Sequence, residues 1–145
     1  MNPTRKLLTL VGCAVLSACD ASRAETLTGA DDSELAELKA SYRHKVWEVI
    51  DARSGDCHMT GVLTLFDNGR AIWTASSRTD STGFADIWHE SLKVSDDAGR
   101  VLFGFGVWDS PGMQDDGSHH FWRKTGEFPK ELFDAATMVT SSGDC

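Results

Sequence analysis

Residues 59–77, with the sequence MTGVLTLFDNGRAIWTASS, decide the fold class of this chain. Two runs rich in β-branched and apolar residues, Met59–Phe66 and Arg70–Ser77, flank the turn sequence Asp67-Asn68-Gly69. An Asn-Gly pair supplies the positive φ angles that a tight turn between antiparallel strands requires. The stretch therefore predicts a β-hairpin, and it is the best hairpin signal in the sequence.

Further strand signals lie on both sides of this hairpin, separated by turn sequences such as Asp96-Asp97-Ala98-Gly99. The strand expected over residues 84–95 should be bulged, because its apolar residues change face between Ile87 and Trp88. The next strand should alternate cleanly, with Val101, Phe103, Phe105 and Val107 on one face. Other strands are expected over residues 46–52, 119–124 and 136–141, and a short helical turn over residues 129–134.

One helix is predicted before the strands, from about Asp32 to Arg43. Asp31 can cap it, and Leu35, Leu38 and Tyr42 recur on one face. Six or seven short strands joined mainly by tight turns then predict a mainly β domain. The expected architecture is a small antiparallel meander that closes as a barrel or as a two-sheet sandwich, preceded by this N-terminal helix.

The composition excludes two classes of protein. The 145 residues contain 14 Lys and Arg against 22 Asp and Glu, so the formal net charge is -8. Such an acidic chain is not expected to bind nucleic acid, since duplex binding depends on basic side chains that neutralise phosphates. Five Trp and seven Phe supply more apolar surface for burial than disordered chains carry.

The first nineteen residues resemble the signal sequence of bacterial lipoproteins. Arg5 and Lys6 precede an uncharged run, residues 7–18, that is too short to span a bilayer but fits the hydrophobic region of a signal peptide. Leu16-Ser17-Ala18-Cys19 then resembles the lipobox, in which small residues precede a Cys that is lipidated and becomes the new N-terminus. The resemblance implies removal of the signal peptide and lipidation of Cys19.

The resulting organisation has a signal peptide over residues 1–18, a lipid-anchored linker over 19–30 and a single β-rich domain over 31–145. The lipid would hold the domain at the cell envelope, facing the periplasm. Asp20 favours the inner membrane, because in enteric lipoproteins an Asp after the lipidated Cys favours retention there. The alternative is cleavage after Ala24, with Ser22 and Ala24 as the small residues, which would release a secreted protein without Cys19.

The remaining cysteines are expected to pair. If Cys13 leaves with the signal peptide and Cys19 carries lipid, Cys57 and Cys145 remain in an oxidising compartment. Both end the same tetrapeptide, Ser-Gly-Asp-Cys. We therefore expect a structural Cys57–Cys145 disulfide. A redox-active or metal-binding pair is the alternative, but no Cys-x-x-Cys spacing supports it.

The body of the chain also resembles small exported bacterial proteins of uncharacterised function. The residues that carry this resemblance are Trp47, Gly55-Asp56-Cys57, Leu65 to Gly69, Ala71, Trp73, Asp86, Trp88 and Cys145. The resemblance implies a β fold and a Cys57–Cys145 pairing, and it carries no known site.

The longest connection between predicted strands runs from Asp109 to Ser118 and leads into His119 and His120. Binding residues concentrate on such loops, and carboxylates beside imidazoles can hold a transition metal or form an acid/base pair. Adjacent His residues on a strand, however, point to opposite faces. The loop is therefore interpreted as a solvated acidic segment, with one His outward and one inward, and no metal or cofactor is predicted.

The five Trp residues lie in five different predicted strands, which favours a packed core. Trp108 and Trp122 flank the long loop and are expected to line an opening. The candidate binding residues are Trp108, Asp109, Asp115, Asp116, His120 and Trp122. His58 and His89 are isolated in the sequence and are given no role, and no catalytic residue is assigned because nucleophile motifs are absent from the sequence.

Three functions remain open at this point. The first is a non-catalytic binding lipoprotein at the envelope, such as an inhibitor or immunity protein for an exported enzyme or toxin, with a protein partner. The second is a calycin-like barrel that binds a small ligand. The third, with the lowest weight, is a hydrolase that uses Asp109, Asp115, Asp116 and His120.

Overall fold

The computed structural model describes residues 29–80, 85–114 and 116–145. The predicted signal peptide, Cys19, most of the linker, Phe84 and Asp115 lie outside the described residues. The elements, in chain order, are α1 (Gly29–Ser41), β1 (His44–Ser54), β2 (Cys57–Phe66), β3 (Arg70–Thr79), β4 (His89–Ser95), β5 (Val101–Asp109), β6 (His120–Glu127), the 3-10 turn η1 (Lys130–Leu132) and β7 (Met138–Asp144).

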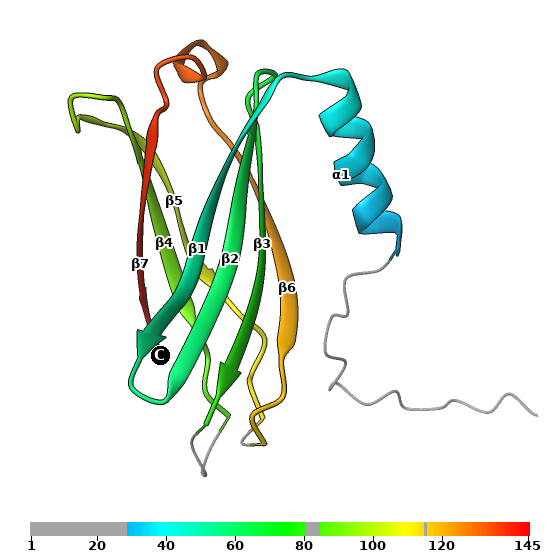
Figure 1. The fold of residues 1–145 in the computed structure, drawn as a ribbon, viewed down its shortest axis with the longest axis vertical. Coiled ribbons are helices and arrows are strands. Elements are labelled where there is room, and N and C mark those ends of the chain that lie inside the picture. The colour runs from blue at the N-terminus through cyan, green and yellow to red at the C-terminus, as the bar shows by residue number, and fades with distance from the viewer. Residues whose placement is uncertain (1–28, 81–84, 115) are drawn as a thin grey trace, which may run out of the picture.

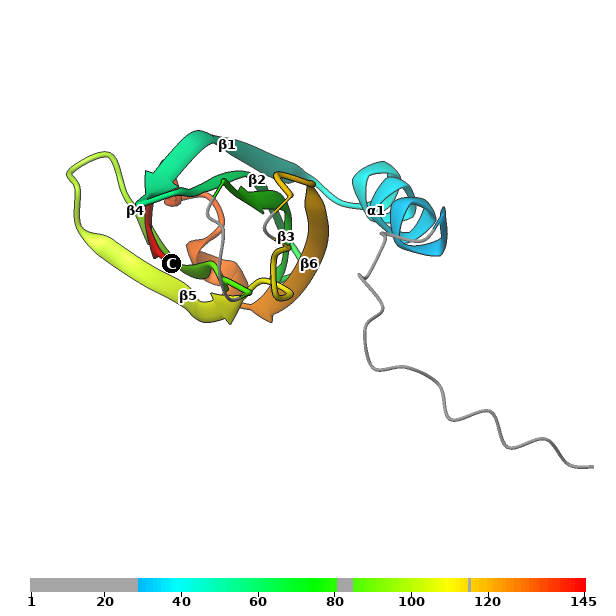
Figure 2. The same cartoon turned by 90° about the horizontal axis from the view of Figure 1, so that it is seen from below.

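The seven strands form two antiparallel sheets that face each other (Figure 1). One sheet has the order β1-β2-β3-β6 and the other the order β5-β4-β7. Figure 2 shows the four-stranded sheet curving around one side of the molecule with the three-stranded sheet across from it. The predicted mainly β fold with one N-terminal helix is confirmed, and it is a sandwich.

The barrel alternative is wrong, because no hydrogen-bonded ladder between described strands joins the two sheets. The simple meander is also only partly correct. Neighbours in sequence pair from β1 to β3, but β3 then pairs with β6, and β4 lies between β5 and β7. Turn sequences identify which strands are joined by hairpins, but they carry no information on these distant pairings.

The hairpin predicted over residues 59–77 is confirmed as β2 and β3. Its turn is closed by a hydrogen bond of 3.0 Å from the Gly69 amide to the Phe66 carbonyl. Gly69 has a φ of +91°, whereas Asn68 does not have a positive φ. The Asn-Gly pair therefore forms a turn with a single left-handed residue, the arrangement typical of three-residue hairpin loops, rather than one with two such residues.

The helix α1 packs on the outer face of the four-stranded sheet. It begins at Gly29, so Asp31 lies in its first turn and is not its cap. Leu35 and Leu38 contact Phe66 and Ile72, two outward-facing residues of the β2–β3 hairpin. Tyr42, which was expected on the same apolar stripe, lies beyond the helix and is 41% exposed.

Charged side chains hold the same helix. Arg123 of β6 donates to Asp31 and Glu34, at 3.2 Å and 2.9 Å, and Arg70 of β3 donates to Glu34 at 2.7 Å. The helix therefore covers one half of the outer face of this sheet, and the other half stays open (Figure 1).

The strand β5 does not alternate as predicted. Opposite β4 it carries an extra residue at two places, between Trp108 and Phe105 and between Phe103 and Val101. Such bulges change which side chains face the core. Phe103, Phe105 and Trp108 consequently pack on the core, while Val107 is 66% exposed. The bulge predicted at residues 87–88 is wrong in place, since β4 begins only at His89.

Aromatic rings fill the space between the sheets. Trp73, Trp88 and Trp122 are fully buried, and Trp47 and Trp108 are partly buried against them. Two glycines make room for these rings: a Cβ atom at Gly61 would lie 2.2 Å from the Trp73 ring, and one at Gly143 would lie 2.4 Å from the Trp88 ring. The core prediction for the Trp residues is therefore confirmed for three of the five.

The Cys57–Cys145 disulfide is present, with the two Cα atoms 6.3 Å apart. Cys57 begins β2 in one sheet, and Cys145 follows β7 in the other. The bond therefore ties the two sheets of the sandwich together at one end.

Candidate functional site

The structure disperses the residues predicted around the long loop. Asp109 pairs with His89 across β4 and β5, with Oδ1 and Nδ1 2.7 Å apart. Asp116 accepts a hydrogen bond of 2.8 Å from the Ser118 amide, and hydrogen bonds from Ser118 hold the pKa of this carboxyl below its usual value of 3.8. These carboxylates therefore take part in local contacts, and Asp115 lies outside the described residues.

His120 has a structural position. It is 8% exposed, and its Nε2 atom accepts a hydrogen bond of 3.2 Å from the Gln114 amide. Its neighbour His119 is exposed, so one imidazole points inward and the other outward, as the sequence predicts. His120 thus fixes the base of the loop and does not join Asp109.

The two Trp residues that flank the loop also have different surroundings. Trp122 is 1% exposed and lies edge-on to Trp73, with ring centroids 6.3 Å apart, so it belongs to the core. Trp108 is partly buried and stacks on Phe105, with ring centroids 5.3 Å apart. The pair therefore does not frame an opening.

A groove of about 320 Å³ lies instead on the open half of the four-stranded sheet. We call it the outer-sheet groove, and it is lined by Asp51, His58, Met59, Thr60, Ser76, Arg78, His119 and Phe121. Most of these residues alternate along their strands with core residues, so they share the outward face. In β3, for example, Ser76 and Arg78 point outward, whereas Ala75 and Ser77 are buried.

A bulge in β1 brings Asp51 to this groove. The register of β1 against β2 shifts between Val49 and Ala52, and Asp51 has a φ of +52°. Asp and Asn tolerate this left-handed conformation better than other residues with a side chain, because they can hydrogen-bond locally. The Asp51 amide donates to the Thr60 hydroxyl at 3.3 Å, which holds the bulge against β2.

His58 lies between two carboxylates at the edge of the outer-sheet groove. Its Nδ1 atom is 3.2 Å from Asp51 Oδ1, and its Nε2 atom is 3.2 Å from Asp80 Oδ2. Arg53 pairs with Asp51 at 2.6 Å, and Arg78 pairs with Asp80. The hydrogen bond from Arg53, followed by that from His58, lowers the pKa of Asp51 from 3.8 to about 2. The edge is thus a network in which two carboxylates alternate with Arg53, His58 and Arg78.

A polar pair and an aromatic ring complete the groove. Ser76 Oγ and His119 Nδ1 are 3.0 Å apart, a hydrogen bond between β3 and the residue that precedes β6. Phe121 follows on β6 and is 50% exposed.

Two signals in the sequence could have indicated this groove. His58 and Thr60 are spaced by two along β2, as are Ser76 and Arg78 along β3, and the hairpin register pairs them as His58–Arg78 and Thr60–Ser76. Polar residues at alternate positions on paired strands share one solvent-facing surface. The part played by Asp51 had no such signal, because it depends on the bulge.

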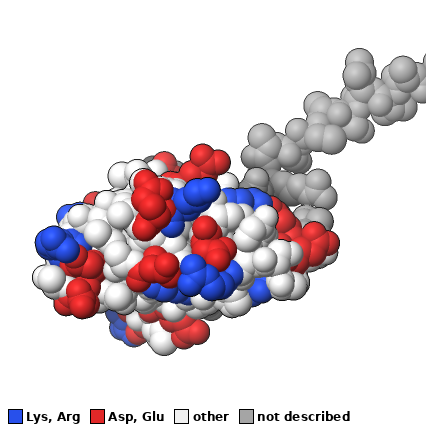
Figure 3. Space-filling view, turned by 90° about the horizontal axis from the view of Figure 1, so that it is seen from above, with Lys and Arg blue, Asp and Glu red and all other residues white. Residues whose placement is uncertain are grey.

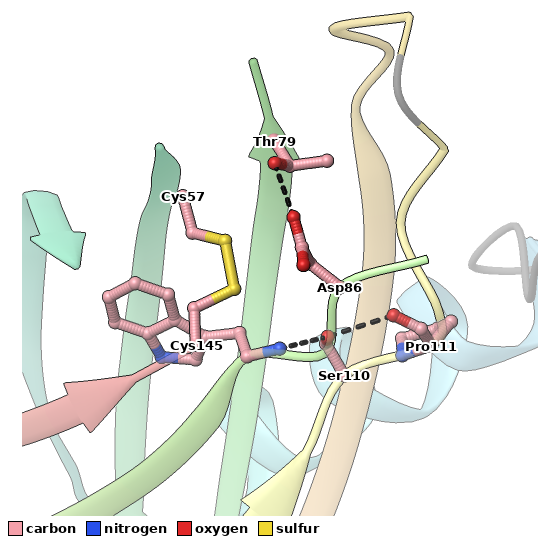
Figure 4. The surroundings of a disulfide bond; sticks show 7 residues. Cys57, Thr79, Asp86, Ser110, Pro111 and Cys145 are labelled. Carbon is pink, nitrogen blue, oxygen red and sulfur yellow. Dashed lines mark hydrogen bonds between the residues drawn. A yellow bond between two sulfur atoms is a disulfide. The ribbon is translucent and has the colours of Figure 1, made fainter. Parts of the chain in front are cut away.

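A second cluster surrounds the disulfide (Figure 4). One ligand atom each of Cys57, Asp86 and Cys145 lies within 4.8 Å of the other two, and this is the one such group of three found among the described residues. The Thr79 hydroxyl donates to Asp86 Oδ2 at 2.7 Å. Ser110 Oγ accepts from the Trp88 amide and donates to the Pro111 carbonyl, which fixes the neighbouring segments.

A buried carboxyl group, Glu90, lies further inside the sandwich. The Trp88 indole donates to Glu90 Oε2 at 2.9 Å, and the Ser141 hydroxyl donates to Oε1 at 2.7 Å. Burial raises the pKa of Glu90 above its usual value of 4.5 against the lowering effect of these hydrogen bonds. The residue therefore links β4 to β7 inside the core.

The acidic excess is not concentrated at the end of the sandwich that Figure 3 shows. Acidic and basic side chains are interspersed there. Basic side chains also pair with acidic ones: Arg43 contacts both Asp67 and Asp134 at 3.0 Å. No helix in the described part of the chain is long and apolar enough to cross a membrane.

Comparison with known proteins identifies one relationship. The profile of a family of unknown function, DUF6294, matches residues 62–145, which is more than half of the chain. The chain belongs to the DUF6294 family. No curated protein and no solved structure matches it significantly.

The DUF6294 match covers only some of the residues that line the outer-sheet groove. Ser76, Arg78, His119 and Phe121 lie within the matched residues, whereas Asp51 and His58 precede them. The match also includes Asp86 and Cys145 but not Cys57. The family match therefore covers the chain from the middle of β2 onward and assigns no activity.

Proposed function

We propose that this DUF6294 protein is an envelope-anchored, non-catalytic lipoprotein whose domain binds a protein partner through the outer-sheet groove. The observation that carries the proposal is the half-exposed Phe121 ring in an open groove that Arg78 and His58 also line. An inhibitor or an immunity protein for an exported enzyme or toxin fits this arrangement. The lipid on Cys19 would hold the groove at the periplasmic face of the membrane.

The residue types of the groove support a protein partner. Aromatic and Arg side chains dominate the energetically important positions of protein interfaces, and they act best when polar groups surround them. In the outer-sheet groove Phe121 supplies the aromatic ring, while Asp51 and Arg78 supply charges of both signs. A partner of complementary charge pattern would bind with a defined orientation.

The other two functions gain no comparable support. A calycin-like module needs an apolar cavity inside a closed barrel, but here Trp73, Trp88 and Trp122 fill the interior of a sandwich. A hydrolase built on Asp109 and His120 needs those side chains to meet, and each has a different partner.

The partner test uses the full chain, expressed with an affinity tag in its own envelope and cross-linked before extraction. The variant Phe121→Ala is compared with Val107→Ala, which removes an even more exposed apolar side chain from the other sheet. We expect a stoichiometric protein partner whose recovery falls at least tenfold in Phe121→Ala and stays unchanged in Val107→Ala. Equal recovery with both variants, or no partner at all, would contradict the proposed interface.

The anchor is tested separately. Labelled palmitate should enter the wild-type chain and should not enter a Cys19→Ser variant, because Cys19 carries the lipid in this proposal. Fractionation of the envelope then shows which membrane holds the protein, with the inner membrane expected from Asp20. Unlabelled wild-type protein that begins at Glu25 would instead favour cleavage after Ala24 and secretion.

A further inference from the structure

The disulfide end of the sandwich brings three metal-ligating groups together from distant parts of the chain. Cys57 begins β2, Asp86 precedes β4 and Cys145 follows β7, and their ligand atoms lie within 4.8 Å of one another. Figure 4 shows the Asp86 carboxylate beside the sulfur–sulfur bond. A disulfide sulfur offers no hydrogen to a carboxylate, so the bond itself gives Asp86 no hydrogen-bond partner.

The surroundings hold Asp86 in place. The Thr79 hydroxyl at the end of β3 donates to Oδ2 at 2.7 Å. The Asp86 carbonyl accepts from the Met113 amide at 2.8 Å, so the backbone of Asp86 is held as well. A hydrogen bond to a ligating carboxylate from a neighbouring residue is a usual feature of protein metal sites, because it orients the ligand.

The three groups match one class of ion. Two thiolates and one carboxylate suit Zn²⁺, which takes Cys sulfur at about 2.3 Å and carboxylate oxygen at about 2.0–2.2 Å in a tetrahedral arrangement. The burial of the cluster is graded: Cys57 is buried, Asp86 is half-buried and Cys145 is exposed. The exposed side leaves room for water as the fourth ligand.

We propose that reduction of the Cys57–Cys145 disulfide creates a Zn²⁺ site formed by Cys57, Asp86 and Cys145. A dithiol reductant supplies two electrons and two protons, so it becomes a disulfide while the protein gains two thiols. Zn²⁺ then binds both sulfurs as thiolates, releases two protons to solvent, and takes Asp86 as its third protein ligand. The ion replaces the covalent link between β2 and β7, so the sheets stay tied in either redox state.

The test measures Co²⁺ binding, since Co²⁺ replaces Zn²⁺ and its bonds to thiolates absorb in the near ultraviolet. The full chain in detergent is reduced with a phosphine, which removes the disulfide without adding a competing thiol. We expect one Co²⁺ per reduced chain with thiolate absorption, displaced by one equivalent of Zn²⁺, and no such absorption in the oxidised protein. Absence of the absorption in the reduced protein would overturn the proposal.

Two carboxylate variants separate a formed site from two thiols that happen to be free. Asp86→Asn removes the ligand, whereas Asp144→Asn removes an exposed carboxylate next to Cys145 that is outside the cluster. We expect the Co²⁺ affinity to fall at least tenfold in Asp86→Asn and to stay unchanged in Asp144→Asn. Equal affinities in both variants would show that Asp86 is not a ligand and would overturn the site.

Circular dichroism covers the case in which reduction unfolds the domain. Addition of Zn²⁺ to the reduced chain should then restore the near-ultraviolet signal of the buried Trp residues, because the ion re-forms the link between the sheets. Metal binding without recovery of this signal would mean that the thiols bind Zn²⁺ in an unfolded chain, which contradicts the proposal.

Discussion

At the scale of single residues, Glu90 shows how one buried side chain makes stability depend on pH. Three donors, the Trp88 indole, the Ser141 hydroxyl and the Ser142 amide, hydrogen-bond its carboxyl group. Burial still raises the pKa above 4.5, because removing a charge from water costs more than these hydrogen bonds return. The native chain therefore holds the Glu90 proton at pH values at which the unfolded chain has lost it.

Stability should fall as the pH rises from about 4.5 through the raised pKa, since the unfolded state binds fewer protons there. A Glu90→Gln variant keeps the shape and can accept from Trp88 while donating to Ser141. We expect its stability in urea to lose this part of the pH dependence and to exceed that of the wild type most clearly above the raised pKa of Glu90. Parallel pH profiles for the two proteins would contradict the assignment.

Two strand glycines give a second prediction at this scale. A Cβ atom at Gly61 or Gly143 would overlap the Trp73 or Trp88 ring, and neither ring has space to move in a filled core. Gly61→Ala and Gly143→Ala should each destabilise the protein by roughly 1–3 kcal/mol, the usual cost of overpacking. Gly112→Ala is the control, because its Cβ would meet Ala85 at an ordinary 3.5 Å. Thermal unfolding measures all three, and a loss as large in the control would refute the steric explanation.

At the scale of elements, the disulfide connects strands that no turn joins. Cys57 and Cys145 are separated by 88 residues, and the bond links β2 of one sheet to the end of β7 in the other. Closing so long a loop removes much conformational freedom from the unfolded chain. The bond therefore acts on the whole sandwich rather than on one hairpin.

Removal of both cysteines should accordingly destabilise the domain by about 4–5 kcal/mol. The Cys57→Ala, Cys145→Ala double variant is measured by urea unfolding in the presence of a metal chelator, alongside the reduced wild-type protein. The two should have similar stabilities, well below that of the oxidised protein. A double variant as stable as the oxidised wild type would show that the disulfide adds nothing to the fold.

The sequence predicts the elements that depend on neighbouring residues, but not the pairings that depend on distant parts of the chain. Local chemistry predicts the β2–β3 hairpin, the turn at residues 96–99, the helix before the strands and the 3-10 turn after Pro129. It does not predict that β3 pairs with β6, because this pairing depends on how two sheets share one core. It also misplaces the inward face of β5, since a bulge reverses the alternation without changing the composition.

In the outer-sheet groove, too, only the part that depends on local sequence could be predicted. The spacing of the polar residues on β2 and β3 is visible in the sequence, so the outward face of the hairpin could have been found. The contributions of Asp51, His119 and Phe121 could not, because they require the β1 bulge and the β3–β6 pairing. The long loop has the acidic and His-rich composition of a binding loop, yet its side chains mainly hydrogen-bond to neighbouring segments.

At the scale of the whole molecule, the fold depends on contacts between distant parts of the chain. In the strand ladders, Arg70 of β3 lies opposite Glu127 of β6, and His89 of β4 lies opposite Asp144 of β7. Neither sheet is therefore complete until the last strands are in place. Ordering such long loops slows folding, because the entropy is lost before the contacts form. Small proteins with this kind of topology fold in milliseconds to seconds.

We therefore expect refolding of the oxidised protein in that range. Stopped-flow fluorescence of the buried Trp residues provides the measurement. The reduced protein should refold more slowly, since the disulfide holds the region of β2 near β7 in the unfolded chain and shortens the search for the β4–β7 pairing. Equal rates for the oxidised and reduced chains would show that this pairing forms only after the rate-limiting step.

The bulge at Ile50 and Asp51 has a consequence for the behaviour of many copies in solution. The strand β1 lies at an edge of its sheet, with peptide groups on one side that have no ladder partner among the described strands. A regular edge of this kind is a template on which a second copy can add a strand. The left-handed Asp51 interrupts that template midway and places a charge there, so the residue that supplies the groove with a carboxylate also works against fibril-like growth.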